Sequence, residues 1–155
     1  MTSLLVNASE IDLLRALLRQ GARFMVIGGH AVMFYGYLRA TKDLDLFIDT
    51  ATDNPSKIVS ALSAVGVVHP DLTSERLSKP NQQIRVNSIF HTEILTSIAA
   101  VPFREAFEVC AHAIVAELRV PVISRKHLLD TKRALARPQD LEDVAVLEKV
   151  GECAV

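Results

Sequence analysis

Two aspartates stand one residue apart in DLDLF, residues 43–47, a short distance after the adjacent glycines Gly28 and Gly29. Glycine has no Cβ, so its backbone can approach a ligand closely. A helix that starts after such a turn directs unpaired N–H groups at the same point, which favours a phosphate. A pair of carboxylates can hold a magnesium ion that also binds substrate phosphates. Together these residue types indicate chemistry on a phosphate with a divalent metal.

The spacing of Asp43 and Asp45 has two explanations. On a strand, residues i and i+2 project from the same face with Cα atoms about 6.5–7 Å apart. Two ionised carboxylates at that distance repel by roughly 2.5 kcal/mol at an effective dielectric constant near 20. Solvent on an exposed face would absorb this repulsion, whereas a divalent cation would convert it into shared ligation. Taken alone, the aspartate pair favours a solvated surface and the glycine pair is equally consistent with a plain tight turn.

The first half of the chain alternates between helical and strand patterns. Asn7 or Ser9 can cap an apolar-striped helix that Gly21 ends. The segment 43–49 alternates strictly, with leucine and isoleucine on one face and the aspartates on the other. The predicted elements are a helix over 7–21, a buried strand over 23–27, a short helix over 30–36, a strand over 43–49 and a helix over 55–66.

The second half continues the mixed pattern. We predict that residues 102–110 form a helix, because Phe103, Ala106, Phe107 and Cys110 recur at helical spacing, with Cys110 as a reduced thiol in the core. The other predictions are a loop over 72–82, strands over 83–86 and 90–98, two short strands within 113–124, and helices over 125–136 and 138–150. This order predicts one α/β (α+β) domain over residues 1–155, with a mixed sheet flanked by helices.

Composition excludes several classes of protein. The chain has 155 residues, half of them apolar, which is enough for a buried core and unlike a disordered chain. A formal net charge of −1 argues against bulk electrostatic binding of nucleic acid, and two cysteines do not make a disulfide framework. The N-terminus lacks a signal-peptide pattern, and no apolar run reaches the roughly 20 residues of a membrane span. We therefore expect a cytoplasmic protein with no membrane partner.

The order strand, Gly-Gly, helix, aspartate strand resembles the nucleotidyltransferases of the DNA polymerase β superfamily. The segment GGHA…YGYLRATKDLDLFI is most similar to the small bacterial branch that contains minimal and abortive-infection nucleotidyltransferases. HTEILTSI followed by FREAF resembles the strand of that branch's third carboxylate and its next helix, and VISRKHLLDTKRALARPQDLEDVAVL resembles its two C-terminal helices. The resemblance covers about Phe24 to Leu147 and implies a polymerase-β-like fold.

The resemblance assigns roles to the glycines and the acids. It implies that Gly28 and Gly29 hold nucleotide phosphates and that Asp43 and Asp45 bind magnesium. The third acid falls on Glu93, which would complete the metal site and accept the proton of an attacking hydroxyl. The family usually has aspartate there, so Glu93 is a departure that bears on activity. Its alternative role is an exposed charge on an edge strand.

Basic residues around these segments have alternative roles too. Arg39 and Lys42 flank the aspartate strand and can meet phosphate oxygens or neutralise the carboxylates. The resemblance places Lys132 near the triphosphate. Lys126, Arg133 and Arg137 can line one helix face, although a solvated face is the ordinary interpretation of such a run. For Arg137 with Asp140 and Asp143, we expect a salt-bridge network that pins the last two helices.

The histidines lack zinc-ligand spacing with cysteine or another histidine. His30 adjoins the glycines, so it can contact a phosphate or acceptor or simply cap the helix. His91 shares the strand face of Glu93 and can neighbour the site.

Two functions follow from these residues. The first is a magnesium-dependent nucleotidyltransferase that moves a nucleoside monophosphate from a nucleoside triphosphate to an acceptor hydroxyl on a tRNA, a protein or a small molecule. By resemblance it belongs to a toxin–antitoxin or phage-defence system. The second is a catalytically silent binding module of the same fold, acting as an antitoxin or regulator with a cognate partner protein. A weaker third is a generic α/β domain that binds another anion at the glycine turn.

Overall fold

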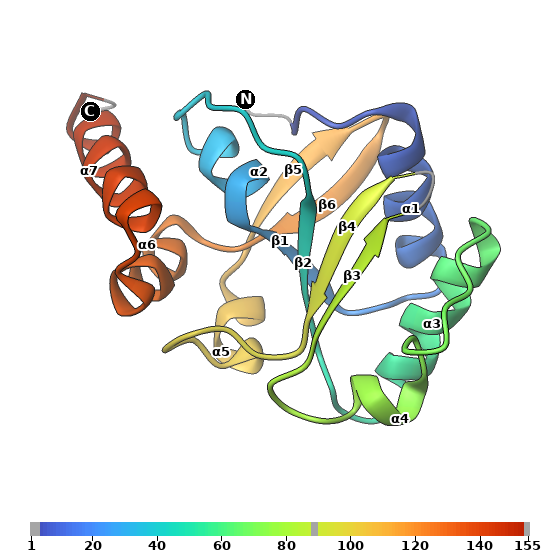
Figure 1. Ribbon diagram of the computed structural model, residues 1–155. Coiled ribbons are helices and arrows are strands. Elements are labelled where there is room, and N and C mark those ends of the chain that lie inside the picture. The colour runs from blue at the N-terminus through green and yellow to red at the C-terminus, as the bar shows by residue number, and fades with distance from the viewer. Residues whose placement is uncertain (1–3, 88–89, 154–155) are drawn as a thin grey trace.

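The computed structural model of the chain describes residues 4–87 and 90–153. Its six strands form one mixed sheet flanked by helices (Figure 1). The helices are α1 Ala8–Arg19, α2 Gly28–Phe34, α3 Asn54–Ala64, α4 Ser74–Leu77, α5 Phe103–Glu108, α6 Arg125–Leu135 and α7 Pro138–Cys153. The strands are β1 Phe24–Ile27, β2 Leu44–Ile48, β3 Gln83–Asn87, β4 His91–Leu95, β5 Ala111–Val115 and β6 Leu118–Val122.

The strand order is β3-β4-β2-β1-β6-β5. Neighbouring pairs are antiparallel except β2 with β4 and β1 with β6, which are parallel. The two parallel pairs need crossover connections, and α3 and α4 lie in the connection from β2 to the β3–β4 pair. As a result, the aspartate strand β2 lies inside the sheet, next to the strand that carries Glu93.

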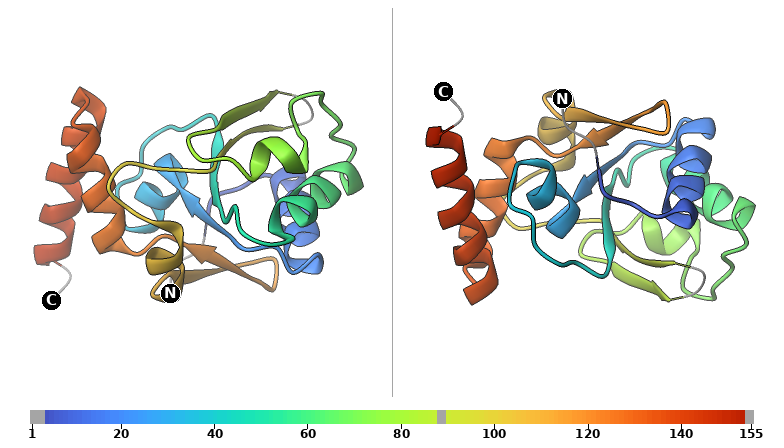
Figure 2. Two further views of the ribbon diagram at one scale, coloured as in Figure 1. Left: turned by 90° about the horizontal axis from the view of Figure 1, so that it is seen from below. Right: turned by 90° about the horizontal axis from the view of Figure 1, so that it is seen from above.

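The two faces of the sheet differ in composition. One face carries Leu44, Leu46 and Ile48 of β2, all buried, and its β3 and β4 positions are buried as well. Helices α1 and α3 pack against each other on this side, and α2, α5, α6 and α7 lie on the other side (Figures 1 and 2). The opposite face carries Asp45 and Glu93 together with buried apolar side chains such as Phe47, so apolar packing covers both faces and the acids lie within one of them.

Local signals explain most of the boundaries. Asn7 caps α1 by accepting a hydrogen bond from the backbone N–H of Glu10, whose side chain accepts one from the backbone N–H of Asn7, a capping box. Ser124 caps α6, and Pro138 starts α7, where its missing N–H costs nothing. These boundaries agree with those predicted from the sequence.

Three local predictions are wrong. The segment predicted as a loop, 72–82, contains the short helix α4, capped by the Thr73 hydroxyl. Helix α2 begins at Gly28 itself, because Gly28 has a φ of +66° and turns the chain directly from β1 into the helix. Helix α5 ends at Glu108, so Cys110 is a half-buried free thiol in the link to β5, outside any helical stripe.

Within the described ranges, none of the helices combines the length and apolar composition that crossing a membrane requires.

Candidate metal and nucleotide site

Strand pairing places the acids of β2 and β4 side by side. Asp45 lies directly opposite Glu93 in the parallel β2–β4 pair, and opposite Ile27 in the β1–β2 pair. Residues paired across strands share a face of the sheet. Glu93 is in turn opposite Arg85 of β3. One row across the sheet therefore reads Ile27, Asp45, Glu93, Arg85, and Asp43 immediately precedes β2.

The three predicted acids converge. Asp43, Asp45 and Glu93 each place a carboxylate oxygen within 4.8 Å of the other two. Glu93 is buried and Asp43 and Asp45 are half-buried, so Glu93 is not the exposed edge charge of the alternative interpretation. The Asp45 Oδ1 atom is buried and has no hydrogen-bond partner. A buried carboxylate oxygen without a partner is costly unless it ligates a cation.

The electrostatics of Asp45 reflect this crowding. Burial raises the pKa of Asp45, and the negative charges of Glu93 and Asp43 add to the rise, so that the pKa reaches about 7. Arg85 and Lys132 oppose the rise without cancelling it. At neutral pH the Asp45 carboxyl is therefore near its pKa and is partly protonated. This is expected where three carboxylates meet without enough positive charge to balance them. Hard oxygen ligands of this kind suit magnesium.

Both glycines are needed to bring the turn against the aspartate strand. A Cβ on Gly28 would meet the Asp45 carboxylate, lying 3.1 Å from its Cγ atom. A Cβ on Gly29 would meet the Thr41 side chain, lying 2.6 Å from its Cβ atom. Gly29 is therefore required by packing within the protein, a reason independent of any phosphate.

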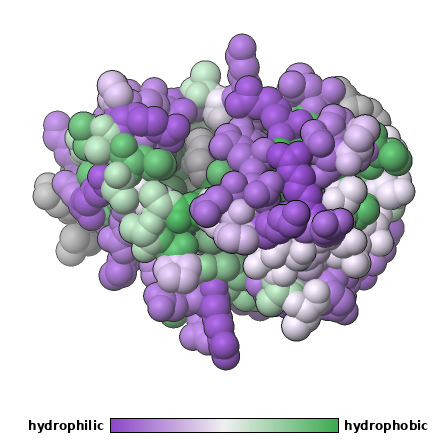
Figure 3. All heavy atoms as spheres, turned by 60° about the horizontal axis from the view of Figure 1, so that its bottom comes forward, coloured by the Kyte–Doolittle hydropathy of each residue, from purple (hydrophilic) through white to green (hydrophobic). Residues whose placement is uncertain are grey.

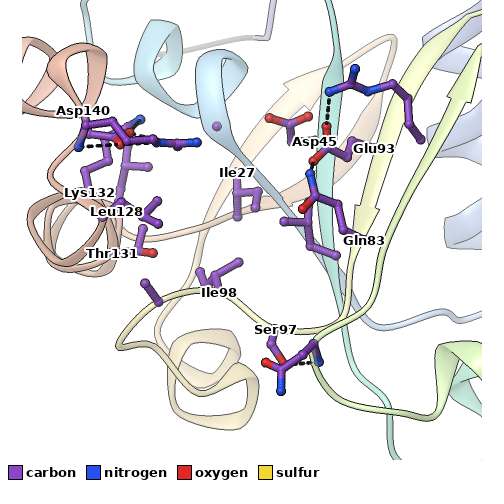
Figure 4. A pocket seen from close by; sticks show the side chains of 17 residues that line it. Ile27, Asp45, Gln83, Glu93, Ser97, Ile98, Leu128, Thr131, Lys132 and Asp140 are labelled. Carbon is purple, nitrogen blue, oxygen red and sulfur yellow. Dashed lines mark hydrogen bonds and ion pairs between the residues drawn. The ribbon is translucent and has the colours of Figure 1, made fainter.

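Glu93 is held by two neighbours on β3. The Gln83 side-chain amide donates a hydrogen bond to Glu93 Oε1, and the Arg85 guanidinium donates one to Oε2 at 3.2 Å (Figure 4). Arg85 also lies 3.8 Å from Asp43 Oδ2. In the part of the chain that the structure describes, Arg85 is the only cationic side chain that forms ion pairs within the group of three acids, one with Asp43 and one with Glu93.

The cations predicted to bind phosphate are engaged elsewhere. Lys132 is buried, with its ammonium 3.3 Å from Asp140 and 2.9 Å from Asp143. Arg39 donates two hydrogen bonds to the Asp143 carboxylate, at 2.8 and 2.9 Å, and Arg137 pairs with Asp140 at 2.6 Å. The expected network between the last two helices is thus present, and Arg39 extends it to the loop before β2.

These pairs set the titration of the two aspartates. Burial alone would raise the pKa values of Asp140 and Asp143. Hydrogen bonds from Arg137 to Asp140 and from Arg39 to Asp143, together with Lys132, outweigh burial and hold both pKa values below the ordinary range. Both aspartates are therefore ionised in the native protein and neutralise Lys132 and Arg39.

Two adjoining cavities meet at the carboxylates. One, of about 510 Å³, lies between β1–β4 and α6; the labelled side chains Ile27, Ile98 and Leu128 form its apolar part and the acids one end (Figure 4). The other, of about 520 Å³, lies on the side of Gly29, Lys42 and Gln139. Figure 3 shows a group of apolar side chains left of the centre of this face, bordered by hydrophilic side chains. Residues common to both cavities are Gly28, Asp45, Glu93, Lys132, Arg137 and Asp140.

The remaining candidates are dispersed. Lys42 is exposed at the wall of the second cavity and makes no ion pair within the described ranges. His30 is buried, makes no capping hydrogen bond to α2, and interacts with the Asp43 backbone; burial lowers its pKa. His91 is exposed and bonds Asn87. Lys126 and Arg133 pair with Asp130 and Glu148, so no free basic stripe runs along α6.

Sequence reasoning missed Gln83 and Arg85. Their alternation with buried Ile84 and Val86 was visible and assigns both to one strand face. The pairing of Arg85 with Glu93 depends on the register between β3 and β4, which alternation alone does not fix.

No protein-family model matches the chain, and no curated protein matches it significantly.

Proposed function

We propose that the protein is a magnesium-dependent nucleotidyltransferase with a polymerase-β-like fold. The acceptor hydroxyl would attack the α-phosphate of a nucleoside triphosphate, taking up the nucleoside monophosphate while pyrophosphate leaves. The observation that carries this proposal is the convergence of Asp43, Asp45 and Glu93 at the junction of two cavities, with a buried Asp45 oxygen that has no partner. The donor set consists of carboxylates alone, which fits magnesium.

The three carboxylates would hold the metal, which supplies charge neutralisation to the phosphates. Two cavities that meet at one group of acids suit a reaction with two substrates, one in each cavity. Glu93 would receive the proton of the acceptor hydroxyl once its hydrogen bonds with Gln83 and Arg85 give way. Such a transfer depends mainly on positioning and charge, and the rigid sheet supplies the positioning.

A silent binding module of the same fold is the second candidate. The observation in its favour is that Lys132 and Arg39, expected near the triphosphate, are neutralised by Asp140 and Asp143. A module of this kind would act as an antitoxin or regulator through a partner protein. It would need neither magnesium nor acceptor at the acidic cluster.

The test is label transfer from each of the four α-labelled nucleoside triphosphates, with magnesium and a cell extract that supplies acceptors. We expect labelled product with the wild type and none with Asp45→Asn. Asp49→Asn is the matched control, because Asp49 is on the same strand face but pairs with Arg23 at 2.7 Å, away from the cluster. Nucleotide binding without transfer in the wild type would favour the binding module. Equal transfer by Asp45→Asn and wild type would remove the metal site from the mechanism.

A further inference from the structure

Arg85 is placed in the acidic cluster by register. It lies on β3 directly opposite Glu93, which lies directly opposite Asp45 on β2. Its guanidinium therefore reaches Glu93 at 3.2 Å and Asp43 at 3.8 Å without any bend in the strand. It supplies the positive charge that a metal ion would supply at the same oxygens.

This pairing is loose. The Arg85 side chain is 59% exposed, and the approach to Asp43 is longer than a hydrogen bond. Exposed ion pairs contribute little to stability, so the guanidinium can leave at small cost. The pairing is also incomplete, because Asp45 Oδ1 has no partner. Arg85 therefore acts as a partial counter-ion for the carboxylates.

Two of the cations expected at phosphates are less available. Lys132 is buried between two aspartates, and Arg39 is held by two hydrogen bonds to one carboxylate. Arg85 lines the 510 Å³ cavity that ends at the acids, as Lys132 does, but its side chain is exposed rather than buried. A guanidinium presents a planar fork of donors that matches phosphate oxygens bidentately. When a divalent cation takes the carboxylate oxygens, the exposed Arg85 side chain is at the cavity wall and free to turn.

We propose that Arg85 exchanges partners: it pairs with Glu93 and Asp43 in the metal-free site and with the phosphates of the nucleotide in the loaded site. The proposal rests on the proposed function, because it requires a metal and a nucleotide in this cavity. It has two consequences of opposite sign. Without nucleotide, Arg85 competes with the metal for the carboxylates; with nucleotide, it strengthens binding.

The test uses Arg85→Gln, Arg85→Lys and the control Arg76→Gln. Arg76 is on the connection before β3 and bonds Asp71 and Gln82, so its loss tests the effect of removing an arginine remote from the acids. Binding of Mn²⁺ alone is measured by electron paramagnetic resonance of the free ion. Binding of nucleotide is measured by calorimetry with magnesium and the α,β-methylene analogues of ATP, CTP, GTP and UTP, which cannot transfer.

For Arg85→Gln we expect Mn²⁺ to bind about threefold more tightly and nucleotide at least tenfold more weakly. Arg85→Lys should lie between, because it keeps the charge and loses the fork. Arg76→Gln should match the wild type. Nucleotide binding unchanged in Arg85→Gln, or Mn²⁺ binding unchanged or weakened, overturns the exchange while the proposed function stands. A wild type that binds no metal or no nucleotide overturns the proposed function and this inference together.

Discussion

Replacing Asp45 with asparagine should stabilise the metal-free protein at pH 8. The side chain keeps its shape but loses the charge that burial, Glu93 and Asp43 disfavour. The pKa of Asp45 rises from 3.8 to about 7 on folding, so the folded state binds the proton more tightly than the unfolded state. Stability linked to this proton is present below pH 4 and is lost as the pH rises through 7.

The size of the effect follows from the pKa. The rise in the pKa of Asp45 from 3.8 to about 7 corresponds to a loss of about 4 kcal/mol in the free energy of unfolding once the carboxyl is ionised. This is an upper value, because the group is partly exposed. We therefore expect Asp45→Asn to gain roughly 2–4 kcal/mol in the free energy of unfolding at pH 8. For a domain of 155 residues, that gain raises Tm by about 6–12 °C.

The assay is thermal unfolding in chelator at pH 5 and pH 8, followed by circular dichroism and calorimetry. The gain should be largest at pH 8 and less than half as large at pH 5, where the folded carboxyl is protonated but the unfolded one is already ionised. Asp49→Asn should lose stability at both values, because it breaks the pair with Arg23. Equal Tm values for wild type and Asp45→Asn at pH 8, or a gain that grows toward pH 5, would refute the reasoning. Magnesium should raise Tm at pH 8 for the wild type and much less for Asp45→Asn.

Three further outcomes are expected. Magnesium binding should release protons near pH 7 and become tighter from pH 6 to pH 8, because Asp45 must be ionised to bind the metal. Calorimetry in two buffers of different ionisation enthalpy measures the released protons. An affinity that does not change with pH would contradict this expectation. Gly29→Ala should lower the free energy of unfolding by about 1–3 kcal/mol, because the added Cβ clashes with Thr41. In denaturant titrations, adding Thr41→Gly should restore part of this loss. A Gly29→Ala variant as stable as the wild type would argue against the crowding. Glu93→Gln should keep the fold and most nucleotide binding but lose label transfer, and Glu93→Asp should slow transfer by withdrawing the carboxylate; transfer by Glu93→Gln at the wild-type rate would exclude Glu93 from the mechanism.

Most elements and the shared strand face of Asp43 and Asp45 were accessible from the sequence, because they depend on local signals. Alternation assigned Asp43 and Asp45 to one face of a strand, and capping residues marked α1, α6 and α7. The short helix α4 was missed because four residues are too few for a periodic pattern. The choice of Glu93 as the third acid came from the family resemblance and not from spacing, and its register opposite Asp45 was not predicted.

The sequence did not show which carboxylate each basic side chain would contact. Lys132 and Arg39 were expected at phosphates or at the acids of β2, yet both contact Asp143. Arg85, which no motif distinguishes, contacts the acids instead. Each outcome depends on strand register and on how α7 packs, and these are set by long-range contacts rather than by neighbouring residues.

The Asp143 carboxylate joins three distant segments of the chain: the loop before β2 through Arg39, helix α6 through Lys132, and its own helix α7. A change at this buried position would take a carboxylate partner from both Arg39 and Lys132. A change at either cation would leave the Asp143 carboxylate partly unpaired. Substitutions at positions 39, 132 and 143 should therefore occur together rather than singly. Among related chains, an altered Asp143 should occur together with altered residues at positions 39 and 132, even where the acids of the sheet are kept.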